Sequence, residues 1–331
     1  MSQVRARDIV ERTVLADVGG TNVRFAVLTG DVLSPIERMA VCDYACLGDA
    51  LAVFLRRQLD HAAICRAIFA VAGVVEGDRC ALTNSPWVVE ADELRARFRL
   101  TGIHIVNDFE AIAWALPSLT HHDLRMVGGR EPAAGAPMVV LGPGTGLGVA
   151  AYVPHEKGGI VLRSEGGHAT VPSGSLREDS VIEKLRRRFG HVSAERVLSG
   201  HGLENLYRTI ASIDSLNVPE RTAAEITRAA LDDRCAASRA ALDLFCAMFG
   251  DVAGNFALSF AAQGGVFIAG GIVPQLGDYL VRSQFRSRFE AKGRMSGYVE
   301  PIPAYLILHD DPAFIGLRSL AAQRAWKAGG R

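Results

Sequence analysis

Two short turns rich in glycine and threonine, each lying between apolar strand-like runs, constrain the fold of this chain more than any other feature. The first turn, DVGGTN at residues 17–22, lies within VLADVGGTNVRFAVL, and the second, GPGTGLG at 142–148, lies within MVVLGPGTGLGVAAYV. Each turn leads into another apolar run and not into a helix, which predicts a β-hairpin. Because tight hairpin turns commonly need positive φ, we expect the glycines to adopt it.

The same two turns predict an anion site. Successive main-chain N–H groups in a tight turn form a concavity that suits phosphate. Neither turn matches the P-loop or the dinucleotide-binding fingerprint, because GxxxxGK[ST] is absent and no helix follows. Two such hairpins in one chain predict a phosphate group held from two sides, although each one taken singly is equally compatible with an ordinary glycine hairpin.

Length, charge and cysteine spacing limit the class of protein. A chain of 331 residues is long enough for two domains. It has 36 basic and 36 acidic residues, so no surplus of positive charge indicates nucleic acid or an anionic membrane as a partner. The 6 cysteines show no CxxC pair and no zinc-like spacing, which favours free thiols in a reducing compartment.

Two segments, the N-terminus and a long apolar stretch, bear on the localisation of the protein. The first 13 residues, MSQVRARDIVERT, are charged throughout and lack the apolar region of a signal peptide. The apolar stretch 240–260 contains Asp243, Asp251 and Asn255, so we expect a buried helix and not a membrane span. We therefore expect a cytoplasmic protein.

The order of apolar patterns predicts a mixed α/β protein. Apolar runs predict strands at 13–18, 23–28, 66–77, 79–89, 102–108, 138–153, 264–274 and 305–310, with turns inside several of them. Helices are expected at 48–58, 92–98, 109–116, 180–189, 193–198, 202–210, 223–231, 235–262 and 313–327. The composition turns to Gly, Pro and Ala at 128–135, which predicts a linker there.

The two hairpins also suggest an internal repeat. Aligning Thr21 with Thr145 places Gly20 on Gly144 and Ala26 on Ala150, so the same strand, Gly-Thr turn and strand begin each half of the chain. This repetition predicts two related folding units.

Asp17 adds chemistry to the first turn. A carboxylate beside a phosphate site repels the phosphate unless a cation lies between them. Mg²⁺ meets this need, because it binds phosphate oxygens and waters while a carboxylate neutralises it, often through water. Thr21 adds a hydroxyl donor to the same turn.

Asn107 and Asp108 end an apolar strand and immediately precede a helix-like run. One interpretation is a helix N-cap, which both residue types favour. The other is functional, because α/β proteins place reactive groups at the carboxyl ends of strands. A single carboxylate there can accept a proton from a substrate hydroxyl.

Three further segments offer polar or flat surfaces. Glu165 and His168 flank a Gly-Gly pair that disfavours a helix, so they fit either a surface loop or a loop that binds vicinal sugar hydroxyls. Glu195 follows Ser193 by two residues, which favours an electrostatic role at a helix N-terminus. The glycine pairs that flank the run at 264–271 suit either tight strand–helix packing or close approach of a flat ring.

Taken together, these segments resemble one family, the bacterial glucokinases of the hexokinase and actin-like ATPase superfamily. The motifs DVGGTN, NDFEA, GPGTGLGV, SEGGH, SAERVLSG and GGVFIAGGIVP occur in the order and spacing of that family, over nearly the whole chain. The resemblance implies a two-domain actin-like ATPase (ribonuclease H-like) α/β fold with an interdomain cleft. It also implies a small domain at 1–118 plus 309–331 and a large domain at 119–308.

The resemblance implies that ATP phosphorylates D-glucose at O6, at the entry to glycolysis, and that the protein is a homodimer. Asp108 would be the general base, and Asn107, Glu165, His168 and Glu195 would bind the other sugar hydroxyls. Mg²⁺ would lie near Asp17 and would be bound to it through water. The residues implied for ATP are Asp17, Gly19, Gly20, Thr21, Asn22, Gly144, Thr145, Gly146, Gly270 and Gly271.

The residues alone are also compatible with other functions. A kinase for another hexose or an amino sugar would need the same machinery, because sequence does not show which epimer fits. A sugar-sensing protein on the same fold would need no base at residue 108. An actin-like or chaperone-like ATPase would need no SEGGH loop.

Overall fold

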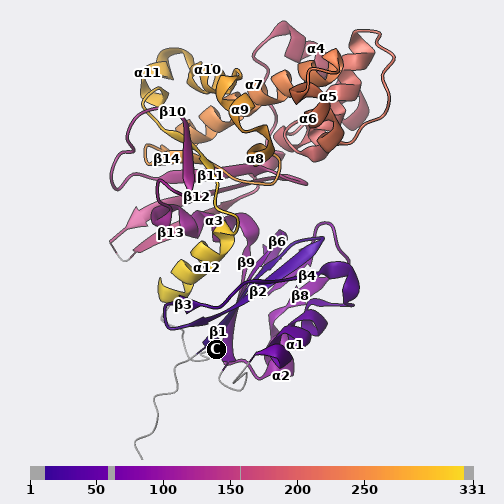
Figure 1. Ribbon diagram of the computed structural model, residues 1–331. Coiled ribbons are helices and arrows are strands. Elements are labelled where there is room, and N and C mark those ends of the chain that lie inside the picture. Colours follow the sequence, from indigo (N-terminus) through magenta and orange to yellow (C-terminus); the bar gives the residue numbers. More distant parts are fainter. Residues whose placement is uncertain (1–11, 59–63, 157, 324–331) are drawn as a thin grey trace, which may run out of the picture. The chain divides into compact units, whose positions relative to one another are not determined.

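Figure 1 shows the computed structural model, which describes residues 12–58, 64–156 and 158–323. The chain divides into two compact units. Unit 1 comprises Met1–Ser118 and Asp311–Arg331, and unit 2 comprises Leu119–Asp310. The N-terminal residues on which the targeting prediction rests, and the end of the predicted last helix beyond Gln323, lie outside the described residues.

Unit 1 is an α/β unit. Its elements are β1 (Arg12–Val18), β2 (Asn22–Thr29), β3 (Val32–Leu33), β4 (Glu37–Ala40), α1 (Leu47–Arg57), β5 (Ile64–Val71), β6 (Gly73–Glu76), β7 (Arg79–Leu82), β8 (Val88–Glu90), α2 (Ala91–Phe98), β9 (Gly102–Asn107), α3 (Asp108–Ala115) and α12 (Pro312–Gln323). The main sheet has the order β3-β2-β1-β5-β9, with β4 also paired to β2, and β6-β7-β8 form a smaller sheet.

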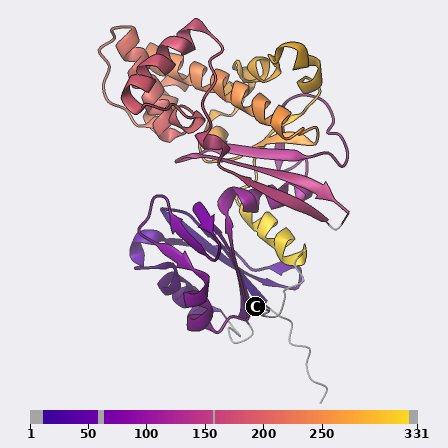
Figure 2. The ribbon, with the colours of Figure 1, turned by 180° about the vertical axis from the view of Figure 1, so that it is seen from behind.

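The main sheet of unit 1 is buried on both faces, so its strands carry continuous apolar runs. Val14 and Phe25 belong to the face that packs on α1, where Phe25 stacks on Phe54 at 5.1 Å between ring centroids. Leu15 and Ile68, of the opposite parity, are also fully buried. Helices α3 and α12 pack on each other and contact the strands of the same sheet (Figures 1 and 2).

Unit 2 joins a second sheet to a helical cluster. Its strands are β10 (Leu124–Gly128), β11 (Met138–Pro143), β12 (Leu147–His155), β13 (Gly158–Ser164), β14 (Gly265–Ile268) and β15 (Ala304–Ile307). Its helices are α4 (Leu176–Phe189), α5 (Gly200–Ile213), α6 (Ala223–Leu231), α7 (Ala236–Ser259), α8 (Val273–Leu276), α9 (Asp278–Arg282), α10 (Phe285–Glu290) and α11 (Ser296–Val299). The strand order is β10-β15-β14-β11-β12-β13.

The two main sheets share one topology, which confirms the predicted repeat. In unit 1, β1 pairs antiparallel with β2 and parallel with β5, and β5 pairs parallel with β9. In unit 2, β11 pairs antiparallel with β12 and parallel with β14, and β14 pairs parallel with β15. The hairpin that begins each half therefore occupies the same place in its sheet.

Helix α7 is the apolar helix predicted from the stretch 240–260. It is long and apolar enough to cross a membrane by length and composition, but 78% of its most apolar window is buried inside the protein. Its side chains Phe245 and Phe249 are fully buried in the core of unit 2. The prediction of a buried helix is confirmed, and in Figure 1 α7 passes through the helical cluster.

Several predicted elements were wrong in detail. The segment 128–135, expected to be a linker, lies inside unit 2, where Arg130 N donates to Pro301 O at 3.0 Å and Ala133 N donates to Gln263 O at 3.0 Å. The run 66–77 is two strands, because the chain leaves the main sheet after Val71. The helix expected at 193–198 is one 3₁₀ turn, Ala194–Arg196. Strands β3, β4, β10 and β13 and helices α8 to α11 were not predicted.

Candidate active site

The first turn joins β1 to β2 in unit 1. Gly19 N donates to Asn22 O at 3.0 Å, and Thr21 O accepts a hydrogen bond from Val41 N at 2.9 Å. A Cβ atom at Gly20 would lie 3.0 Å from the carbonyl oxygen of Asn84, so this glycine lets the loop after β7 approach the turn closely.

The second turn joins β11 to β12 in unit 2. Gly144 N donates to Gly146 O at 2.8 Å, and Gly144 O accepts from Gly200 N, the first residue of α5, at 2.9 Å. A Cβ atom at Gly146 would lie 2.4 Å from Oε2 of Glu195. None of the described residues with positive φ belongs to either turn, so the expectation of positive φ was wrong. At Gly20 and Gly146, glycine is instead required by close approach of a neighbour.

Asp17 lies one rung from the first turn, opposite Arg24 on β2. The Arg24 guanidinium lies 3.3 Å from Asp17 Oδ2 and 2.8 Å from Asp311 Oδ1, so one cation serves two carboxylates. Burial raises the pKa of Asp17, Arg24 opposes the rise, and Asp311 adds to it. Arg38 also lowers the pKa of Asp17, but burial outweighs both arginines.

The residues present fit Mg²⁺ in only one way. The described residues contain no group of three or more His, Cys, Asp or Glu side chains placed to hold a metal ion. A Mg²⁺ ion that is bound by nucleotide phosphates and waters needs only one or two protein carboxylates. Asp17 satisfies that requirement, so the site suits an ion delivered with a nucleotide and not a resident metal.

Asn107 and Asp108 lie where β9 ends and α3 begins. The Asn107 side chain caps α3, because its Oδ1 accepts from Phe109 N at 2.9 Å and from Glu110 N at 3.3 Å. Its Nδ2 donates to Gly73 O at 3.1 Å, and a hydrogen bond from the same side chain lowers the pKa of Asp108. The capping interpretation is therefore confirmed for Asn107.

Asp108 has the environment of a general base. Its Oδ1 accepts from Phe109 N at 2.9 Å. Burial, with the nearby charge of Asp17, raises the pKa of Asp108 to about 7, and the hydrogen bonds from Phe109 and Asn107 only partly oppose the rise. A carboxylate with a pKa near neutral pH is suited to take a proton from a hydroxyl group.

Unit 2 brings Glu165, His168 and Glu195 together. His168 Nε2 lies 3.9 Å from Glu165 Oε2, and His168 Nδ1 lies 4.0 Å from Glu195 Oε1. The bridge between Thr170 and Ser193 places the two 3₁₀ turns of this cluster side by side. The Glu165 and His168 side chains are more than 60% exposed, so their polar atoms are open to a ligand.

Gly270 adjoins the second turn. It has φ +93°, and a Cβ atom there would lie 2.5 Å from Pro143 O at the end of β11. No heavy atom lies within 4 Å of a Cβ atom built on Gly271. The packing interpretation therefore applies to Gly270, whereas Gly271 leaves open space of the kind a flat ring requires.

Sequence reasoning missed three residues that contact the predicted ones. Arg24 could have been found, because the hairpin register places it opposite Asp17. Asp311 and Asn84 could not, because Asp311 lies 287 residues from Arg24 and Asn84 contacts Gly20 only through the fold.

Comparison with known proteins shows the class and then the family. The fold is the two-domain actin-like ATPase fold of sugar kinases: a ROK family glucokinase from Streptomyces griseus, solved in complex with glucose and AMPPNP, has a TM-score of 0.63 at 18% identity and covers 95% of this chain and 100% of that one. The crystal structure of a glucokinase from an Antarctic psychrotroph has a TM-score of 0.86 at 32% identity, and covers 95% of this chain and 99% of that one.

The sequence comparisons are more specific. A family model described as Glucokinase matches residues 14–324. The glucokinase of Paramagnetospirillum magneticum is 44% identical over 313 residues, which is 94% of this chain and 97% of the relative. This chain belongs to the glucokinase family.

Proposed function

We propose that this protein transfers the γ-phosphoryl group of ATP to O6 of D-glucose, giving glucose 6-phosphate and ADP. The observation that carries the proposal is the placement of Asp108 at the carboxyl end of β9, with its pKa raised to about 7. Membership of the glucokinase family supports the same reaction. A sugar sensor would need no titratable base at this position.

Asp108 supplies the proton chemistry. Its carboxylate accepts the proton of the sugar 6-hydroxyl as O6 attacks the γ-phosphorus in line with the leaving ADP oxygen. Phosphoryl transfer otherwise requires mainly positioning and neutralisation of charge. Arg24, 3.3 Å from the Asp17 carboxylate, lowers the pKa of Asp17, but burial outweighs this effect and the net shift is upward.

The other sugar hydroxyls bind to acceptor and donor groups of the remaining proposed site residues. Glu165 and Glu195 accept hydrogen bonds, His168 donates or accepts according to its tautomer, and the side-chain amide of Asn107 donates. The His168 imidazole lies 3.9 Å from the Glu165 carboxylate and 4.0 Å from the Glu195 carboxylate, so adjacent hydroxyls of one ring can reach them.

The glycine turns hold the phosphates. Their main-chain N–H groups donate to the phosphate oxygens, from Gly19, Gly20, Thr21 and Asn22 in the first turn and from Gly144, Thr145 and Gly146 in the second. Gly270 and Gly271 face the adenosine. Mg²⁺, when bound with ATP, supplies positive charge to the phosphate oxygens, and Asp17 holds it through water.

A panel of sugars tests the proposal. Glucose, mannose, fructose and N-acetylglucosamine are each offered with ATP and Mg²⁺, and ADP release is followed by a coupled assay. We expect the highest kcat/KM with glucose and no turnover without Mg²⁺. Preference for another sugar would favour the kinase for another hexose or amino sugar, and hydrolysis of ATP without sugar would contradict the proposal.

We further propose a cytoplasmic homodimer, which the resemblance to the family supports. Light scattering with size-exclusion chromatography measures the mass of the particle, for which two copies of a 35.4 kDa chain are expected. A mass of one chain at micromolar concentration would contradict the dimer.

A further inference from the structure

Glu195 contacts the second turn as well as the sugar-binding cluster. Its Oε2 accepts a hydrogen bond from Leu147 N at 3.0 Å, on the residue that follows Gly146. Its Oε1 lies 4.0 Å from His168 Nδ1. One carboxylate therefore has one oxygen on the turn proposed for phosphate and the other toward the residues proposed for glucose.

The sequence of the turn accommodates this carboxylate. A Cβ atom at Gly146 would lie 2.4 Å from Glu195 Oε2, whereas one at Gly144 has no heavy atom within 4 Å. Neither glycine is among the described residues with positive φ, so backbone strain does not require glycine at residue 146. Gly146 is required because a larger residue would displace the Glu195 carboxylate.

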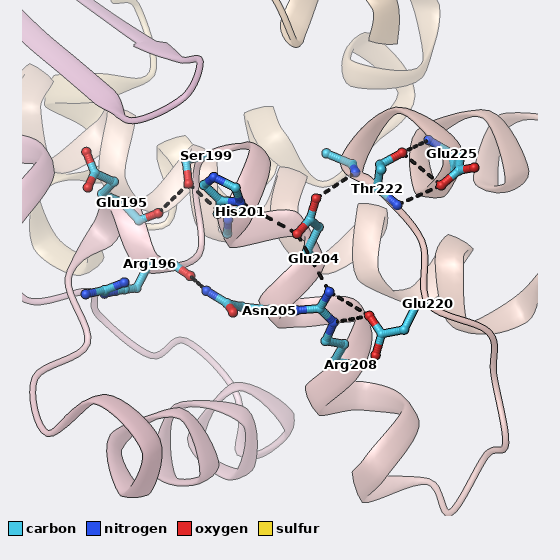
Figure 3. Close-up of polar contacts among 12 residues, drawn as sticks. Glu195, Arg196, Ser199, His201, Glu204, Asn205, Arg208, Glu220, Thr222 and Glu225 are labelled. Carbon is cyan, nitrogen blue, oxygen red and sulfur yellow. Dashed lines mark hydrogen bonds and ion pairs between the residues drawn. The ribbon is translucent and has the colours of Figure 1, made fainter. Parts of the chain in front are cut away.

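The main chain of Glu195 is held firmly. The Ser199 hydroxyl donates to Glu195 O at 2.8 Å, and Asn205 Nδ2 donates to Arg196 O at 3.1 Å. Ala194 N donates at 2.8 Å to the carbonyl oxygen of Ala169, the residue that follows His168. Figure 3 shows the main-chain oxygen of Glu195 bound to Ser199, with its carboxylate turned away from that contact. The side chain can therefore respond to a ligand only by rotation.

We propose that Glu195 couples glucose binding to the phosphate turn, with Gly146 as the positioning residue that lets the carboxylate reach both. The proposal rests on the proposed function, since it deepens the role of the same site. A glucose hydroxyl that donates to Glu195 fixes its rotamer, and the fixed carboxylate holds Leu147 N and the end of the turn. Because coupling is reciprocal, a nucleotide that orders the turn strengthens glucose binding by the same factor.

The test compares Gly146→Ala with Gly144→Ala by titration calorimetry. Glucose binding is measured without nucleotide and then with AMPPNP and Mg²⁺. We expect Gly146→Ala to weaken glucose binding without nucleotide by about tenfold and to abolish the strengthening by AMPPNP, since coupling factors are typically about 5–150-fold. Gly144→Ala is expected to change glucose binding without nucleotide by less than about twofold, since its methyl group meets open space.

Gly146→Ala is expected to fold, because the clashing atom is the end of a side chain that can rotate away, and the melting temperature checks this. A double-mutant cycle with Glu195→Ala then shows whether Gly146→Ala changes glucose affinity directly or by displacing the Glu195 carboxylate. If Gly146→Ala acts through the carboxylate, it changes glucose affinity by less than about twofold in the Glu195→Ala background.

Two results overturn the inference and leave the proposed function intact. One is wild-type glucose affinity in Gly146→Ala, and the other is an equal loss from Gly146→Ala in both backgrounds. If the wild-type protein binds no glucose and phosphorylates none, the proposed function fails and the inference fails with it.

Discussion

The two hairpins have the same place in their sheets but obtain their charge from different sources. In unit 1 the second rung from the turn pairs Asp17 with Arg24, whereas in unit 2 the second rung pairs Gly142 with Gly148. The carboxylate at the second turn comes instead from Glu195, 48 residues after Leu147. The charged residues at the first hairpin therefore lie on its own strands, whereas the carboxylate at the second hairpin lies on a 3₁₀ turn far away in the sequence.

This difference separates two kinds of chemistry. In unit 1, the charge of Asp17 helps to raise the pKa of Asp108, so unit 1 holds the group proposed for proton transfer. In unit 2 the carboxylate is shared between the turn and the cluster with His168. The comparison therefore predicts loss of kcat from changes in unit 1 and loss of affinity from changes in the cluster of unit 2.

The largest effect is expected for Asp108→Asn. Removal of the base lowers kcat by about 10²–10⁴-fold while glucose still binds, because the amide keeps its size and polarity. Steady-state kinetics measure kcat, and calorimetry measures glucose binding. The matched change in unit 2, Glu165→Gln, should raise the KM for glucose with a much smaller effect on kcat. A near wild-type kcat in Asp108→Asn would contradict the assignment of proton transfer to unit 1.

The pH dependence sharpens the assignment of Asp108. The base acts when ionised, so kcat/KM should rise with pH through about 7 and level off above it. Stability should change in the opposite sense. Because the folded pKa of Asp108 lies above its ordinary value of 3.8, the folded state binds more protons between about pH 4 and 7, and this contribution to stability is lost as pH rises through 7.

Thermal unfolding over that pH range checks the stability half of the prediction. Asp108→Asn carries no titrating group at this position, so its melting temperature should fall less than that of the wild type between pH 4 and 7. Parallel curves for the two proteins would show that another group dominates, and would weaken the case for a raised pKa at Asp108.

A smaller effect is expected for Arg24→Gln. The substitution leaves Asp17 and Asp311 without their shared cation, and we expect the free energy of unfolding to fall by about 1–2 kcal/mol. Chemical denaturation of the ligand-free protein measures it. Arg79→Gln is the matched control, because the Arg79–Glu90 pair is half exposed and should contribute less than about 0.5 kcal/mol. Equal losses from the two changes would contradict a special role for Arg24.

The sequence predicted the fold where local patterns were strong. Both hairpins, α6 and the buried helix α7 follow from apolar periodicity and from turn residues. Strand β10 was missed because only Val127 of its five residues is buried, so its apolar signal is weak. The segment 128–135 was misread as a linker because Gly, Pro and Ala mark a loop equally well inside a folded unit.

The site was predictable to the extent that its residues lie in short motifs. Asn107, Asp108, Glu165 and His168 lie in such motifs, and the structure groups Glu165 and His168 with Glu195. The hydrogen bond between Leu147 N and Glu195 could not be foreseen, because it depends on where a 3₁₀ turn packs. The reason for glycine at 146 likewise becomes visible only when the neighbouring carboxylate is placed.

The smallest effect is expected for Pro143→Ala, which tests what shapes the second turn. Pro143 forms the first rung with Leu147, where unit 1 has Val18 opposite Val23. Loss of the ring should lower the free energy of unfolding by about 0.4–1 kcal/mol, because the unfolded chain gains freedom. The KM for ATP should change by less than about twofold, since the turn is held by main-chain bonds from Gly144 to Gly146 and from Gly200 to Gly144, and by Glu195. A tenfold rise in that KM would show that proline, and not these contacts, positions the turn, and the two hairpins would then differ in stiffness as well as in charge.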